Sequence, residues 1–156
     1  MGVQACHRIK TPAPVDLTAG VFNGAGMGVT DQNTDKNLVF RGALHPHKGW
    51  ELTGNYYTGK TNVADAPEDL SKWGGSARVT FSDGTARGEY IGQKKADVET
   101  SGYFVVGAYS FKTPNRLFRE VEPAVRYEYY DPDGDARSRI TFGVNLYLDG
   151  HTANCR

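Results

Sequence analysis

The sequence predicts an all-β protein folded as an antiparallel up-and-down meander of about eight strands. Three observations support this prediction. Apolar and polar residues alternate with a period of two in segment after segment, as they do along a strand with one face toward water. No comparable 3.6-residue period is present, so we expect at most one short helical turn, at residues 67–70. The composition, with 19 Gly and nine Tyr, is typical of many turns and aromatic strand surfaces.

The expected strands follow one another within a single domain, residues 1–156, which is long enough to enclose a core. They are expected at about residues 14–23, 37–46, 49–60, 73–82, 85–94, 102–112, 118–130 and 138–149. Short turns are expected at 47–49, 83–84 and 113–115, and longer polar loops at 24–36, 61–72, 95–101 and 131–137.

The third and fourth expected strands show the alternation directly. In the third, Leu52 lies on the face opposite Glu51, and in the fourth, Phe81 lies opposite Arg78 and Thr80. Side chains alternate across a strand, so each segment has one apolar and one polar face. Both segments are therefore predicted to be strands of one sheet.

The last two expected strands have the clearest pattern. Val125 alternates with Arg126 in the seventh, and in the eighth Ile140 and Phe142 alternate with Arg139. The eighth ends at a turn signal, Asp149-Gly150.

The connections alternate between short and long along the chain. In an antiparallel meander every second connection lies at the same end of the sheet, so one end has tight turns and the other long loops. This asymmetry is typical of outer-membrane β-barrels. No run approaches the 18 or so apolar residues of a membrane-spanning helix. We therefore predict a transmembrane-type β-barrel, either a small closed barrel or part of a larger one.

Alternation alone fits two arrangements, a soluble barrel with its apolar face inside and a membrane barrel with that face outside. Trp and Tyr near strand ends favour the membrane arrangement, because aromatic girdles lie at membrane interfaces. The residues expected to face lipid are Trp50, Tyr56, Trp73, Phe81, Tyr103, Tyr109, Tyr127, Phe142 and Leu146.

The polar face is rich in Arg and Glu and poor in Lys, which is typical of forked ion pairs on a pore wall. Among the expected wall charges, five Arg (41, 78, 87, 126 and 139) balance five Glu (51, 89, 120, 122 and 128), which indicates no anion preference. The expected pore-lining residues are Arg41, Glu51, Asn55, Arg78, Arg87, Glu89, Arg126, Glu128, Arg139 and Asn145.

Four stretches in the segment from Ala77 to the end form a distinctive set: Gly88-Glu89-Tyr90-Ile91, Gly102-Tyr103-Phe104-Val105, the run Val121 to Tyr130 and the run Ile140 to Leu148. On these stretches the segment resembles the C-terminal half of the phosphate-selective porin family (O/P type) of Gram-negative outer membranes. The resemblance implies a barrel of about 16 strands in the cell outer membrane that passes small polar or anionic solutes by diffusion. The chain would then be a fragment or a small relative of such a barrel.

The expected partners are the lipid bilayer, small solutes and, in a homo-oligomer, further copies of the chain. Zero net charge argues against a nucleic-acid partner. Two alternatives stay open: a soluble eight-stranded barrel that binds a small ligand, and a structural barrel that does not conduct.

We expect no enzyme, cofactor or metal site. The acidic segment 131–135 lacks the remaining ligands of a calcium loop, the His45-Pro46-His47 segment lacks a third ligand, and the glycine-rich segment 24–28 lacks the Lys-Ser/Thr of a phosphate loop. Cys6 and Cys155 are either two unrelated thiols or a disulfide between the ends of the chain.

Overall fold

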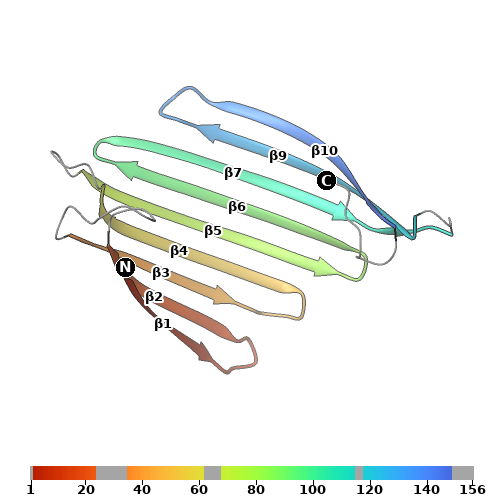
Figure 1. The fold of residues 1–156 in the computed structure, drawn as a ribbon, viewed down its shortest axis with the longest axis horizontal. Coiled ribbons are helices and arrows are strands. Elements are labelled where there is room, and N and C mark those ends of the chain that lie inside the picture. Colours follow the sequence, from red (N-terminus) through yellow and green to blue (C-terminus); the bar gives the residue numbers. More distant parts are fainter. Residues whose placement is uncertain (1, 24–34, 62–67, 115–117, 149–156) are drawn as a thin grey trace.

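The computed structural model describes residues 2–23, 35–61, 68–114 and 118–148. Within them the chain forms one antiparallel sheet and no helix (Figure 1). The strands are β1 (Gly2–Ile9), β2 (Val15–Asn23), β3 (Lys36–Leu44), β4 (Trp50–Lys60), β5 (Asp69–Phe81), β6 (Gly84–Lys95), β7 (Val98–Tyr109), β8 (Phe111–Lys112), β9 (Glu120–Asp131) and β10 (Arg137–Tyr147).

The all-β meander is confirmed, but the sheet has ten strands rather than about eight. Its order is β1-β2-β3-β4-β5-β6-β7-β9-β10, and the two-residue β8 pairs with β9. The strand β1 was not expected, because His7 interrupts the alternation of Val3, Ala5 and Ile9 with polar residues. The sheet is open within the described residues, with β1 and β10 at its edges, so it does not by itself form a barrel.

The expected long loop at 95–101 is wrong. Lys95 pairs with Val98, which leaves Ala96 and Asp97 as a two-residue turn. Ala96 has a φ of 50°, and positive φ is what the common two-residue hairpin turns require. The regular alternation of short and long connections therefore breaks between β6 and β7.

Two further local expectations differ from the structure. The expected helical turn at 67–70 lies partly in β5, because Asp69 and Leu70 pair with Lys60 and Gly59; residue 67 lies outside the described residues. The short turn expected at 113–115 is part of a longer connection from β7 to β9 that includes β8.

In the described part of the chain the sheet is a single layer, so its side chains share two faces that no second layer covers. The buried residues there are Gly20, Asn37, Ala43 and Gly92, so the only buried side chains larger than a hydrogen are those of Asn37, at 2% exposure, and Ala43, at 4%. Large apolar side chains such as Val105, Phe142 and Ile140 are exposed by half or more. The described strands therefore enclose no core between them.

No helix in the described part of the chain is both long and apolar enough to cross a membrane.

Candidate functional site

The strand register sorts the side chains into a polar face and an apolar face. Directly paired residues of antiparallel strands lie on the same face, and the pairs link each strand to the next. The register places all ten residues expected to line a pore on the polar face, and all nine expected to face lipid on the apolar face. The faces are therefore as the alternation predicted, while what each face meets is not decided by the register.

Ion pairs cross the middle of the polar face. Arg78 donates a hydrogen bond to Glu51 of the neighbouring strand at 3.1 Å. Glu128 accepts one from Arg139 at 3.1 Å and forms an ion pair with Arg126 at 2.8 Å. The side chains of Arg78 and Arg139 are more than half exposed, so these pairs fix side-chain positions more than they stabilise the fold.

Arginines also lie beside one another on this face. Arg78 of β5 is directly opposite Arg87 of β6, an arrangement that ion pairs with carboxylates must compensate. Arg87 bonds Glu89 of its own strand at 2.5 Å. On β7, the ring of Phe104 lies 5.5 Å from the guanidinium of Arg87 and 4.3 Å from that of Arg126. These cation–π contacts hold the two arginines over the centre of the sheet.

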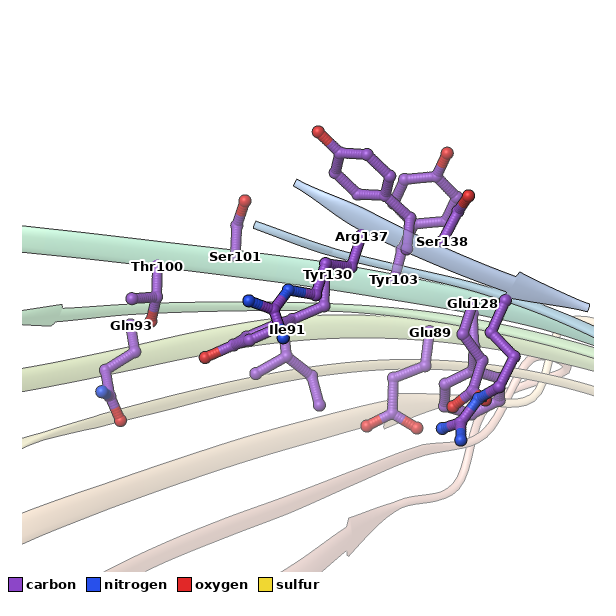
Figure 2. Close-up of a pocket in the computed structure, with 14 residues that line it drawn as sticks. Glu89, Ile91, Gln93, Thr100, Ser101, Tyr103, Glu128, Tyr130, Arg137 and Ser138 are labelled. Carbon is purple, nitrogen blue, oxygen red and sulfur yellow. The ribbon is translucent and has the colours of Figure 1, made fainter. Parts of the chain in front are cut away.

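A hollow of about 620 Å³ near β6, β7, β9 and β10 is lined from both faces of the sheet. Glu89, Ile91, Gln93, Tyr130 and Arg139 line it from the polar face, and Ser101, Tyr103 and Tyr129 from the apolar face. Figure 2 shows Glu89, Ile91 and Gln93 pointing to one side of the sheet and Ser101 and Tyr103 pointing to the other. A smaller hollow of about 350 Å³, bordered by Arg8, Glu51 and Arg78, lies at the turn end.

The polar face carries charges that the sequence analysis did not assign to it. Of the missed residues, Arg8 lies on the unexpected β1, and Lys72, Lys95 and Arg137 lie just beyond the expected strand boundaries. Asp16 and Lys112 lie within expected strands. Their alternation with apolar neighbours was the available signal. Together with the expected ones, the register gives ten basic residues (Arg8, Arg41, Lys72, Arg78, Arg87, Lys95, Lys112, Arg126, Arg137, Arg139) and six acidic residues (Asp16, Glu51, Glu89, Glu120, Glu122, Glu128). The expected balance of five against five is therefore wrong for this face, because it omitted these residues.

An uncharged band runs across the apolar face of five neighbouring strands. On β4 it extends for nine residues, from Trp50 to Thr58, before the first charge at Lys60. The bands of β6, β7 and β9 have the same length, and that of β5 has eleven residues. The charges that end the band at the loop end are Lys60, Asp69, Lys94, Glu99 and Asp131.

The end of the band steps steadily across the sheet. Lys60 pairs with Asp69 on the first two strands, and Lys94 pairs with Glu99 on the next two. Lys94 itself pairs with Ser71, two residues along β5 from Asp69. Asp131 of β9 pairs with Ser101, two residues along β7 from Glu99. The boundary therefore moves by four residues over the four crossings from β4 to β9, about one residue for each strand crossed.

Aromatic rings gather at both ends of this band. At the turn end, Tyr109 lies 6.3 Å from Phe81 and 4.8 Å from Phe111, measured between ring centroids. Toward the loop end, the ring of Tyr103 stacks on that of Tyr129 at 5.2 Å. The expected clustering of aromatic residues near strand ends is present at both boundaries.

The segments considered for metals have other partners. His45 contacts Asp16 at 3.0 Å, and Asp131 accepts a hydrogen bond from the Gly134 backbone within the β9–β10 loop. No group of three or more His, Cys, Asp or Glu side chains suited to a metal is present in the described part. Cys6 lies on the polar face of β1. Cys155 and segment 24–28 lie outside the described residues.

Comparison of the chain with protein-family models, with curated proteins and with solved structures found no match. The resemblance to the phosphate-selective porins stays a prediction based on the residues quoted for it.

Proposed function

We propose that the sheet is part of the wall of an outer-membrane β-barrel, with its apolar face against lipid and its polar face toward a water-filled lumen. The observation that carries this proposal is the uncharged band, bounded by charges at one end and by aromatic rings at both. A face of this composition, exposed across the whole sheet, needs an apolar medium.

The stagger of the band supports a barrel. The boundary of the band shifts by about one residue, or ~3.3 Å along a strand, for each strand spacing of ~4.8 Å across the sheet. The strands are therefore tilted by about 35° from the direction that is perpendicular to this boundary within the sheet. Strands in transmembrane barrels tilt by about 35–45°. A flat sheet lying on a membrane would need no such systematic stagger.

The height of the band supports a membrane. Nine residues at ~3.3 Å each span about 30 Å along a strand, or about 24 Å along the normal at a tilt of 35°. The apolar band of outer-membrane barrels is about 25 Å tall.

The function that follows is passive diffusion of small polar or anionic solutes. A polar wall lowers the cost of removing water from a solute, and the sign of its charges biases which ions pass. The ten basic and six acidic residues of the polar face favour anions.

The two tryptophans provide a direct test, because Trp50 and Trp73 both lie on the apolar face. In vesicles whose acyl chains carry bromine, we expect strong quenching of both, measured in Trp50→Phe and Trp73→Phe variants that retain one tryptophan each. Quenching of neither, with the protein soluble without detergent, would support the soluble alternative and contradict the proposal.

Solute passage needs a separate measurement. We expect vesicles that contain the refolded protein to swell in solutions of small anions. Lipid contact without swelling or conductance would leave a structural barrel and overturn the diffusion part of the proposal.

A further inference from the structure

The two edge strands of the sheet run in the same direction. Nine strands lie along the path from β1 to β10, and each pairs antiparallel with the next. An odd number of alternating strands makes the first and last point the same way, as their arrows do in Figure 1. Pairing β1 with β10 of the same chain would therefore be parallel.

A second copy can meet an edge in two ways that keep the polar and apolar faces in register. A copy that is only translated brings its β1 to β10, and the pair is again parallel. A copy turned by 180° about an axis normal to the sheet brings its own β10 to β10, and this pair is antiparallel. An antiparallel junction between two copies therefore joins like edges, as in an isologous two-fold interface.

The edge at β10 lacks most of the features that protect sheet edges from pairing. Natural edges are shortened, bulged, or interrupted by Pro or charged side chains, most often Lys. β10 has eleven residues, has neither Pro nor Lys, and pairs regularly along its whole length with β9. Its two charged residues, Arg137 and Arg139, lie near its first end, so the eight residues from Ile140 to Tyr147 carry no charge. Within the described part β10 pairs with no other strand. On its apolar face Ile140, Phe142 and Val144 are 60%, 78% and 61% exposed.

The other edge is less suited to this role. β1 has eight residues, and its apolar face includes His7. It therefore offers fewer backbone groups and a less apolar surface than β10.

We propose that β10 is a self-complementary interface through which two copies of the chain pair in antiparallel fashion. The register that pairs all eleven residues is centred on Phe142. It sets Ile140 opposite Val144 of the second copy. It also sets Arg139 opposite Asn145 and Arg137 opposite Tyr147, so that no like charges face each other across the junction.

Two copies joined in this way form a continuous sheet of 18 strands, with the loop ends of the two copies at opposite ends. Barrels of 16–18 strands leave an aqueous channel, whereas about eight strands enclose only side chains. Strand direction and edge chemistry support the pairing, so it does not depend on lipid contact or solute passage.

The oligomeric mass and a cysteine cross-link test the interface together. The protein is refolded in detergent micelles in a Cys6→Ser, Cys155→Ser background, and a single cysteine is introduced by Phe142→Cys. Val3→Cys on β1 is the matched control, because Val3 is also 78% exposed and lies at the other edge. Val105→Cys, 53% exposed on the central β7, reports random collision.

We expect a detergent-corrected mass of two chains and disulfide-linked dimers that form at least tenfold faster for Phe142→Cys than for either control. A mass of one chain at all protein concentrations would overturn the proposal. A dimer that cross-links fastest through Val3→Cys would overturn it too, because the junction would then be at β1. Equal rates at the three positions would indicate collision without a specific junction.

Discussion

The indole ring of Trp73 covers Gly92 on the neighbouring strand. The two residues are directly paired between β5 and β6, and a Cβ atom added to Gly92 would lie 2.3 Å from Cε2 of Trp73. An aromatic ring laid over a cross-strand glycine shields the backbone and pins the register. Phe81 covers Gly84 in the same way at the turn end, where the corresponding distance is 2.5 Å.

The Gly92→Ala substitution should therefore destabilise the sheet. The methyl group displaces the indole, and overpacking of this kind costs about 1–3 kcal/mol. Gly107→Ala is the matched control, because Gly107 is on the same face of the next strand with nothing within 4 Å of an added Cβ. Urea unfolding in detergent micelles would measure both, and equal stabilities would contradict the role of the ring.

Asn37 is the one buried polar residue in the described part of the chain, and the Asn37→Ala substitution should also destabilise the sheet. Its side chain donates a hydrogen bond to the hydroxyl of Tyr57 and accepts one from the backbone N–H of Lys60 at 3.1 Å. Loss of these partners in a buried place costs about 1–3 kcal/mol. Asn145→Ala removes an exposed hydrogen bond to Glu122 and should cost less than ~1 kcal/mol in the same unfolding measurement.

An arginine should be tolerated on one face of β7 and not on the other. Val105 lies in the uncharged band, where Val105→Arg should cost about 2–4 kcal/mol in lipid vesicles, as for a charge near the bilayer midplane. Ala108→Arg, on the polar face beside Thr85 and Ala124, should cost less than ~1 kcal/mol. Reversible unfolding from vesicles gives the two values, and a smaller cost at Val105 than at Ala108 would reverse the assignment of the faces.

The Glu128→Gln substitution should increase the preference for anions. Glu128 contacts Arg126 and Arg139, and its neutralisation leaves two guanidinium groups without this carboxylate. Because the pair partners are exposed, we expect a stability change below ~1 kcal/mol. The reversal potential in a salt gradient should move toward that of the anion. Glu99→Gln, on the apolar face outside the lumen, removes the same charge and should leave that potential unchanged.

Local alternation was enough to predict most strands and both faces. Arg78, Arg126 and Arg139 were assigned correctly to one face because the period of two is a property of each strand alone. The same rule failed where the pattern is interrupted, as by His7 in β1. The turn at Ala96 was also missed, because its positive φ depends on the tight pairing of Lys95 with Val98 and not on a glycine or asparagine.

The edges of the sheet were beyond local reasoning. Whether β10 meets another strand depends on residues far along the chain or on a second copy, and no period within 137–147 encodes it. The basic excess of the polar face followed once the register placed Arg8, Lys72 and Lys112 on the same face as the arginines of the central strands.

The sheet order has a consequence for how the protein folds. Apart from β7 and β9, which are separated in sequence by residues 110–119 with β8 among them, each of the nine strands along the path pairs with the strand that precedes or follows it. Every pairing therefore closes a short stretch of chain, and short closures cost little entropy and favour rapid folding. Any hairpin can form first, and neighbouring strands can then add to its edges one after another. Loss of an edge strand would then remove one pairing while leaving the remaining hairpins able to form.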